Sequence, residues 1–408
     1  MDARTPEPIP PRLSVARLRE LADVDELTLE RLVGAGVLER RDGDEPFVAG
    51  DVYRIRLVLA CEDAGMPAEA IGKAIADGRL SLGFMDLPHY RWTGFSSLTY
   101  RQVAEEFGLP LDLVLETVRS MGSIGRSADD RVREDELELV QLTRLGATMV
   151  DPDALVRTSR VYAQALQRIT DAEEALFERY VLGAFLRQGL SFRQAVDAAN
   201  AFGAETTALQ ERVLLTAYRR QQERQWTEFT VEAVESVLDE MGAIDRAERP
   251  PAFSFVDLAG YTRLTEERGD AESARVAVEL ASMVDAVATS ARGRTVKWLG
   301  DGVMVRFRDP SDAVGATLDI VGRAPAIGLP AHAGVSAGPV VFQDGDYFGR
   351  TVNLAARVAA VAPPGETYVT DLVVRTASGF GFHEVGALDL KGFTDRVTLF
   401  AASRDAAQ

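Results

Sequence analysis

The stretch Lys297-Trp-Leu-Gly-Asp301-Gly302 joins two β-rich runs of the chain through a tight Gly-Asp-Gly turn. Apolar residues stand on both sides of this turn between positions 295 and 307. This pattern predicts a β-hairpin with Asp301 at its tip and Lys297 on its first strand. A second carboxylate, Asp257, follows the apolar run 253–256. Two carboxylates at neighbouring strand ends suit a hard cation, although either residue alone is more typical of an ordinary turn.

Three motifs follow one another in this part of the chain: FVDLAGYT at 255–262, KWLGDG at 297–302 and GDYFGRTVNLAAR at 345–357. Together they resemble the catalytic domain of class III nucleotidyl cyclases, over about residues 251–403. The resemblance implies conversion of ATP to 3′,5′-cyclic AMP and pyrophosphate. The order of strands and helices fits an α+β sheet with helices on one face, and the ferredoxin-like βαββαβ core of the cyclases contains that order.

The resemblance also assigns roles to individual residues. Asp257 and Asp301 match the two aspartates that hold Mg²⁺ or Mn²⁺, two ions per site. Lys297 and Asp346 match the pair that selects the base, the lysine by donating a hydrogen bond to adenine N1 and the aspartate by accepting one from the 6-amino group. This donor and acceptor fit adenine and not guanine, so ATP is the expected substrate.

Further residues are expected around the ribose and the phosphates. Asn353 and Arg357 match residues that orient the ribose and stabilise the phosphate in the transition state, and their four-residue spacing places both on one helix face. Backbone N–H groups after the first strand are candidates for a phosphate cradle or simply a glycine turn: Leu258, Ala259, Gly260, Tyr261 and Thr262. Lys391 matches a triphosphate-contacting lysine, but a surface lysine fits equally well. In the family, one subunit's metal aspartates face the other residues of a second subunit, so a head-to-tail homodimer with two composite sites is expected.

Periodicity and linker composition give the expected organisation of the chain. The expected domains are a disordered segment 1–12, an all-α regulatory domain 13–241, a linker 242–251 and the catalytic domain 252–403. The regulatory domain is expected to contain helix-turn-helix-like modules at about 13–80 and 98–150, then a helical bundle and coupling helix at 153–241. In the catalytic domain we expect strands at 253–256, 331–337, 367–370 and 382–390, a hairpin at 295–307, and helices at 270–290, 310–321 and 351–361.

The first module resembles the N-terminal part of MerR-type DNA-binding domains, including the pair Tyr53-Arg54. A similar helix order recurs about 85 positions later, which indicates an internal repeat. The first module has arginines at Arg17, Arg19, Arg31, Arg40 and Arg41, among others. Acidic residues are interleaved with them, so no basic stripe forms. A helical scaffold is therefore favoured over DNA recognition, and nucleic-acid binding is not expected.

The segment 153–241 has an almost continuous helical pattern, with expected breaks at 189–191 and around Gly203. Its later part carries an apolar stripe made of Leu209, Val213, Leu214, Ala217, Tyr218, Trp226, Phe229, Val234, Val237, Leu238 and Met241. Two interpretations stay open. The stripe is either a subunit contact that couples to the catalytic domain, or the buried face of a core helix.

Composition limits the class of protein. The net charge is −18, with 63 acidic and 45 basic residues, which disfavours a general nucleic-acid binder. The single cysteine excludes an intrachain disulfide, and no apolar stretch reaches the ~20 residues of a membrane span. A cytoplasmic location is therefore expected.

Regulation follows from the resemblance alone. The N-terminal part is similar to that of actinobacterial soluble cyclases, in which it inhibits the catalytic half and responds to pH. The N-terminal region is accordingly expected to inhibit the catalytic domain. The signal that controls it is expected to be either pH or an apolar ligand bound in the helical region. The rival hypothesis is a non-enzymatic, cyclase-like dimerisation module attached to a MerR-like DNA-binding regulator.

Overall fold

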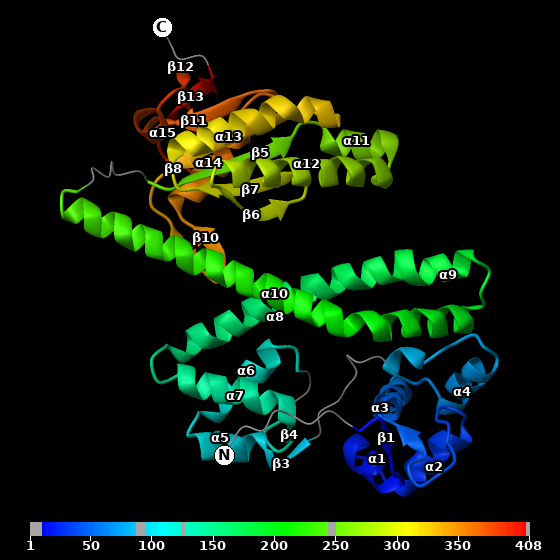
Figure 1. Cartoon of the computed structure of the whole chain (residues 1–408). Coiled ribbons are helices and arrows are strands. Elements are labelled where there is room, and N and C mark those ends of the chain that lie inside the picture. Colours follow the sequence, from blue (N-terminus) through cyan, green and yellow to red (C-terminus); the bar gives the residue numbers. More distant parts are fainter. Residues whose placement is uncertain (1–9, 87–94, 124–126, 244–249, 405–408) are drawn as a thin grey trace. The chain divides into compact units, whose positions relative to one another are not determined.

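The computed structural model describes residues 10–86, 95–123, 127–243 and 250–404. The expected disordered segment 1–12 and linker 242–251 fall largely outside these residues. The chain forms two compact units, Met1–Glu228 and Phe229–Gln408 (Figure 1), and the division lies within the long helix α10 (Phe192–Glu240). The last turns of α10 therefore group with the C-terminal unit.

The first unit begins with two small modules. Their elements are β1 (Arg12–Leu13), α1 (Val15–Ala22), α2 (Glu26–Gly34), β2 (Phe47–Val48), α3 (Gly50–Asp63), α4 (Ala68–Ala76), η1 (Gly83–Asp86), β3 (Phe95–Thr99), α5 (Tyr100–Phe107), α6 (Leu111–Ser120), β4 (Arg131–Arg133) and α7 (Glu134–Gly146). Both modules follow the order strand, helix, helix, strand, helix, and in each the two strands pair antiparallel. The helices α5, α6 and α7 begin 85, 85 and 84 positions after α1, α2 and α3, so the internal repeat is present in the structure.

The two modules keep a buried carboxylate at the same place but neutralise it differently. Asp51 and Glu136, 85 positions apart, are 1% and 7% exposed, and each accepts a hydrogen bond from the backbone N–H three residues before it. Asp51 is ion-paired with Arg54 at 2.7 Å, whereas Glu136 accepts hydrogen bonds from the hydroxyls of Tyr100 and Ser123. Buried carboxylates need such partners, and the repeat has two different sets of them.

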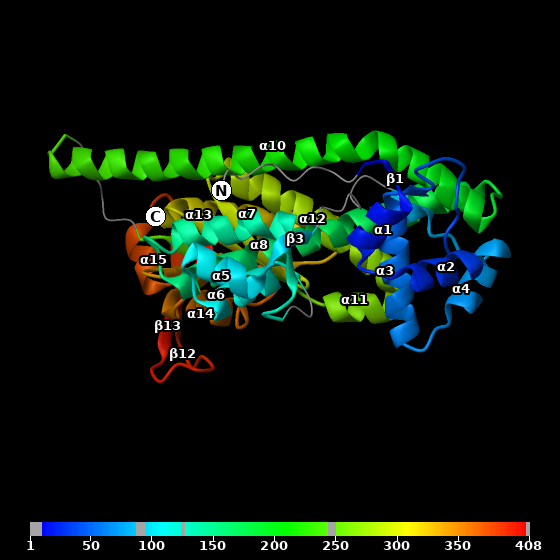
Figure 2. The same ribbon diagram turned by 90° about the horizontal axis from the view of Figure 1, so that it is seen from below.

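The rest of the first unit is a helical region. It consists of α8 (Pro152–Leu176), the π-helical turn η3 (Phe177–Leu182), α9 (Gly183–Arg187) and α10. The expected break at 189–191 is present, but the expected break around Gly203 is wrong, because α10 continues through that residue (Figure 2). A glycine inside a helix costs only about 1 kcal/mol, and long helical flanks override that cost. Of the eleven side chains of the apolar stripe, ten are exposed and Leu238 is partly buried, which does not support the core-helix interpretation.

The second unit contains an α/β domain. Its elements are β5 (Ala252–Leu258), α11 (Tyr261–Arg268), α12 (Asp270–Ser290), β6 (Arg294–Leu299), β7 (Gly302–Phe307), α13 (Pro310–Arg323), η4 (Ala324–Ile327), β8 (Ala331–Ala337), β9 (Val341–Gln343), β10 (Asp346–Phe348), α14 (Arg350–Ala359), β11 (Thr367–Thr370), α15 (Asp371–Thr376), β12 (Gly381–Leu388) and β13 (Val397–Ser403). The mixed α/β class with a helical N-terminal region is confirmed.

Seven of these strands form one sheet in the order β12-β13-β11-β8-β5-β7-β6. The four neighbours β8, β5, β7 and β6 pair antiparallel throughout, and β5, helix, β6, β7, helix, β8 is a βαββαβ connection. The hairpin β9–β10 lies outside this sheet as a separate ladder.

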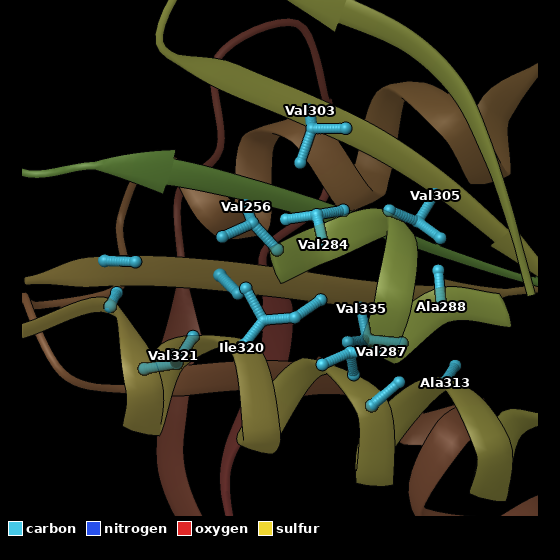
Figure 3. Packing of buried hydrophobic residues seen from close by; sticks show 14 of the residues in the cluster. Val256, Val284, Val287, Ala288, Val303, Val305, Ala313, Ile320, Val321 and Val335 are labelled. Atoms are coloured by element: carbon cyan, nitrogen blue, oxygen red, sulfur yellow. The ribbon is translucent and has the colours of Figure 1, made fainter. Parts of the chain in front are cut away.

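One face of the sheet is covered by α12 and α13. Figure 3 shows the packing, in which valines of the strands meet Val284, Val287 and Ile320 of the two helices. We call this the helix face. Helix α13 begins where Asp309 caps it, its Oδ1 accepting from the Ser311 N–H at 2.7 Å, with Pro310 in the first position.

The expectation that helices cover one face only is wrong. Val352 and Ala355 of α14 pack with Phe253 and Met304, which alternate with the residues of the helix face along their strands. Helix α14 and the hairpin β9–β10 therefore lie on the opposite face. The close approach of α14 requires a glycine in β8, because a Cβ on Gly334 would lie 2.1 Å from the Ala359 nitrogen. We call this second face the site face.

No helix in the described part of the chain is both long enough and apolar enough to span a bilayer.

Candidate active site

The site face receives every second residue of the central strands. Cross-strand partners point to the same side of a sheet, so the register places Phe255, Met304 and Lys297 on one row. Asp257 lies on the next row, opposite Gly302 and His332. The chain thus brings an amine and a carboxylate to the same face from two different strands.

The two predicted metal aspartates lie close together at the ends of β5 and of the β6–β7 hairpin. Gly302, which follows Asp301, pairs with Asp257, and a Cβ there would lie 3.0 Å from Asp257 Oδ1. The pKa of Asp257 is raised above its ordinary value, first by burial and then by the negative charge of Asp301, while His332 acts in the opposite direction. A cation between the two carboxylates would offset both the burial of Asp257 and its repulsion by Asp301.

This pair fits a metal whose other ligands come from water and substrate. Among the residues that the structure describes, no group of three or more His, Cys, Asp and Glu side chains is arranged to hold an ion. Two aspartates alone make a weak site, and Mg²⁺ commonly combines one or two carboxylates with waters and phosphate oxygens. The donor set therefore fits an ion that binds together with a phosphate compound.

The predicted base-selecting residues are in direct contact. The Lys297 ammonium donates to Asp346 Oδ2, and Asp346 Oδ1 accepts from the Tyr347 N–H at 2.8 Å. Both side chains are partly exposed, at 36% and 26%. The pair therefore presents a donor and an acceptor side by side at the surface of the site face.

A β-bulge contributes to this arrangement. The register of β6 against β7 shifts between Thr295 and Lys297, so Val296 is an extra residue on β6. Residues three apart on a regular strand point to opposite faces, but the bulge places both Arg294 and Lys297 on the site face. Thr295 points to the other side, where its hydroxyl hydrogen-bonds to Asp285 of α12 at 2.6 Å.

Helix α14 presents Asn353 and Arg357 on its exposed side, while its other side is buried against the sheet. The expectation that they share one helix face therefore agrees with the structure. Lys391 is exposed in the connection between β12 and β13. Its neighbour Leu390 is buried in a cluster with Leu354 of α14, which holds this connection beside the helix.

The segment 258–262 forms the end of β5 and the start of α11. Leu258 is buried in the core, and Gly260 has φ 84°, which favours glycine. The Ala259 N–H already donates to the Pro330 carbonyl at 2.8 Å. The first amides of α11, at Tyr261 and Thr262, have no acceptor within the helix and remain the better candidates for phosphate.

Two residues of the site face were not anticipated from the sequence. Tyr347 is 9% exposed and follows Asp346 directly, and its hydroxyl accepts a hydrogen bond from Arg294 at 3.1 Å. The sequence did offer one indication of the role of Tyr347. It is a large aromatic residue directly after Asp346, and such a residue in a short strand normally packs inward.

The chain has relatives among characterised and uncharacterised proteins, although no protein-family model matches it. An uncharacterised protein of Mycobacterium tuberculosis is 26% identical over 382 residues, covering 92% of this chain and 94% of that protein. A pH-sensitive adenylate cyclase of the same species is 28% identical over 326 residues, covering 75% and 78%. An adenylate cyclase of Streptomyces griseus is 34% identical over 143 residues, covering 34% of this chain and 35% of that protein.

The paired aspartates, the Lys297–Asp346 contact and the exposed polar face of α14 stand on one side of a βαββαβ sheet, and named adenylate cyclases are related to this chain. These relatives confirm the resemblance that the three sequence motifs indicated, which is to the adenylate cyclases of class III.

Proposed function

We propose that the protein is an adenylyl cyclase that converts ATP to 3′,5′-cyclic AMP and pyrophosphate. The observation that carries the proposal is the contact of Lys297 with Asp346 on the same sheet face as Asp257. An ammonium donor beside a carboxylate acceptor complements N1 and the 6-amino group of adenine. Guanine offers an N–H and a carbonyl at these positions, so the same pair would leave polar groups unsatisfied.

The remaining residues act on the ribose and the phosphates. The ribose 3′-oxygen attacks the α-phosphorus and pyrophosphate leaves, so negative charge must be neutralised and the nucleophile oriented. Arg357 supplies a planar guanidinium for the phosphate in the transition state, and Asn353, one turn earlier, orients the ribose. The amides at Tyr261 and Thr262 and the Lys391 amine are suited to the β- and γ-phosphates.

Asp257 and Asp301 would hold two Mg²⁺ or Mn²⁺ ions. When bound, these ions supply charge neutralisation and a lower pKa for the attacking hydroxyl. The aspartates themselves fix the position of the ions relative to the sheet, because both stand at strand ends that the β5–β7 ladder holds in register.

The active form is proposed to be a head-to-tail homodimer. Each site would combine the two metal aspartates of one chain with Lys297, Asp346, Asn353 and Arg357 of the other. The site face supports this because it leaves large apolar side chains exposed around the candidate residues. These are Leu299, Val341, Phe342 and Phe348, each 49% to 59% exposed. Side chains of this size in one area are typical of a surface that another chain covers.

The experiment is a measurement of cyclic nucleotide formation by the purified full-length protein with ATP or GTP, in Mg²⁺ and in Mn²⁺. The expected result is cyclic AMP from ATP, with activity at least about 100-fold lower in Asp301→Ala. Asp371→Ala, on an exposed helix of the same domain, is the matched control and should keep full activity. Absence of product from the wild-type protein in both metals would contradict the proposal.

The N-terminal unit is proposed to regulate turnover, by autoinhibition that responds to pH or to an apolar ligand. The support is that a pH-sensitive adenylate cyclase is related to this chain over 75% of its length, well beyond the catalytic domain. The activity ratio of full-length protein to residues 251–408 between pH 5 and pH 8 tests the pH signal. A ratio that stays constant would refute it.

The rival function as a MerR-like DNA-binding regulator has less support. The five arginines considered above each have an acidic partner within 4 Å: Arg17 with Glu20, Arg19 with Glu26, Arg31 with Glu62, Arg40 with Glu30 and Arg41 with Asp51. DNA backbones are bound through arginine and lysine side chains that are available to phosphate. Retention of the protein on random-sequence DNA at low salt would revive this alternative.

A further inference from the structure

We propose that Tyr347 is a positioning residue for base selection. Its hydrogen bond with Arg294 is a second contact between β10 and β6, and this contact holds the Asp346 carboxylate against Lys297. The inference rests on the adenylyl cyclase function proposed above. It adds to that function a residue that does not touch the nucleotide itself.

Tyr347 is the anchor of the hairpin β9–β10 on the site face. Its ring packs against Phe253 at 5.2 Å and Phe342 at 4.8 Å between ring centroids, and the Arg306 guanidinium lies 5.5 Å from its centre. The side chain is 9% exposed although the hairpin around it is largely exposed. The side chain of Tyr347 therefore anchors the hairpin that carries Asp346 to the sheet.

The hydroxyl of Tyr347 helps to fix the orientation of the hairpin β9–β10 relative to β6. Arg294 donates to it at 3.1 Å, and Lys297 donates to Asp346 from the same strand. Both donors reach the site face because of the bulge at Val296. Strands β6 and β10 belong to different ladders, so these two hydrogen bonds fix how the hairpin is rotated relative to β6.

The consequence concerns Asp346. Its Oδ1 accepts from the Tyr347 N–H, so the backbone of Tyr347 sets the plane of the carboxylate. When adenine enters, Lys297 must turn from Asp346 toward N1, and the carboxylate loses one of its two hydrogen bonds. If Arg294 still holds the hairpin, Oδ2 of Asp346 stays directed at the 6-amino group. If the hairpin is loosened, the carboxylate can take other orientations, and the discrimination against guanine becomes weaker.

The test is the variant Tyr347→Phe, which keeps the ring and its packing and removes only the hydroxyl. The kinetics of cyclic AMP and cyclic GMP formation are measured with full-length protein and Mn²⁺. We expect kcat/KM for ATP to fall about fivefold, mainly through a higher KM, with a similar loss in the preference for ATP over GTP. Tyr368→Phe, a tyrosine in β11 outside this contact network, is the matched control and should leave both quantities unchanged.

A second variant tests whether Tyr347 acts through its hydrogen bond with Arg294. Arg294→Gln should also weaken base selection, and the double variant should be no less selective than Arg294→Gln alone, because both changes remove the same hydrogen bond. Additive losses would overturn the proposal. So would unchanged KM and base preference in Tyr347→Phe at temperatures where the variant is folded, since a purely structural tyrosine would affect only the melting temperature. A wild-type protein without cyclase activity would instead reject the proposed function, and the inference with it.

Discussion

On β5, Val256 and Leu258 point to the side that α12 and α13 cover, whereas Phe253 and Asp257 point to the side of α14 and the candidate site. The helix face is a closed apolar layer that includes the buried hydroxyl pair of Ser254 and Thr317. The site face has paired and repelling charges, a bulge and exposed aromatic residues. The same strands thus provide buried packing on one face and the candidate site on the other. A substitution on the first face should change stability, and one on the second should change activity.

The largest expected effect is on the site face. Asp257→Asn removes one of the two carboxylates and should lower cyclic AMP formation at least about 100-fold, because the amide cannot replace the charge that a divalent cation requires. The assay uses full-length protein with ATP and Mn²⁺, and Asp371→Asn serves as the control for the chemical change. If the Asp257→Asn variant retained more than about a tenth of the activity, Asp257 would not be a metal ligand.

On the helix face, Ile320→Ala should instead affect stability. Ile320 is 1% exposed at the centre of the cluster in Figure 3, so the truncation removes apolar contacts and leaves a cavity worth about 2–5 kcal/mol. Chemical denaturation of the variant gives this value, and Val278→Ala, at a position 65% exposed, should change it by less than about 0.5 kcal/mol. Activity per folded molecule should stay at the wild-type level. A selective loss of activity in folded protein would show that the two faces are not separate.

The difference between the faces also explains what could be predicted from the sequence. The helix at 270–290 and the strands at 331–337 and 367–370 match the structure to the residue, because buried elements carry a clear apolar pattern. The elements β9, β10, α15 and β13 were not predicted. Strand β9 is exposed along its whole length, so no alternation marks it.

The candidate site was predicted through the family motifs and not through periodicity. Arg294 and Lys297 are three residues apart, a spacing that places them on opposite faces of a regular strand. Only the ladder with β7 reveals the bulge that brings both to the site face. The contact of Arg294 with Tyr347 joins residues 53 positions apart, and no local pattern reports such a contact.

A smaller effect is expected from the buried hydroxyl pair on the helix face. Thr317 Oγ1 lies 2.8 Å from Ser254 Oγ, and both residues are at most 1% exposed. Thr317→Val removes one partner and leaves the serine hydroxyl buried, which should cost about 1–3 kcal/mol in denaturant unfolding. Adding Ser254→Ala should restore part of this loss, because no polar group is then left unpaired. A double variant less stable than the single one would show that the hydroxyl pair is not the source of the cost.

The smallest expected effect is on the stability of the protein and comes from Asp257, a residue that is also expected to be needed for activity. The folded protein raises the pKa of Asp257 by burial and by the charge of Asp301, so the folded state binds a proton there more tightly than the unfolded state. Stability must therefore fall as the pH rises from the ordinary range of an aspartate pKa through the raised value. In EDTA at neutral pH, Asp257→Asn should melt at a higher temperature than the wild-type protein, and the difference should shrink as the pH is lowered toward that range. Mn²⁺ with a non-cyclisable ATP analogue should reverse the order, because only the wild-type pair binds the cation and gains stability from it. Equal melting temperatures at every pH would mean that the site face imposes no electrostatic cost on the fold at this residue.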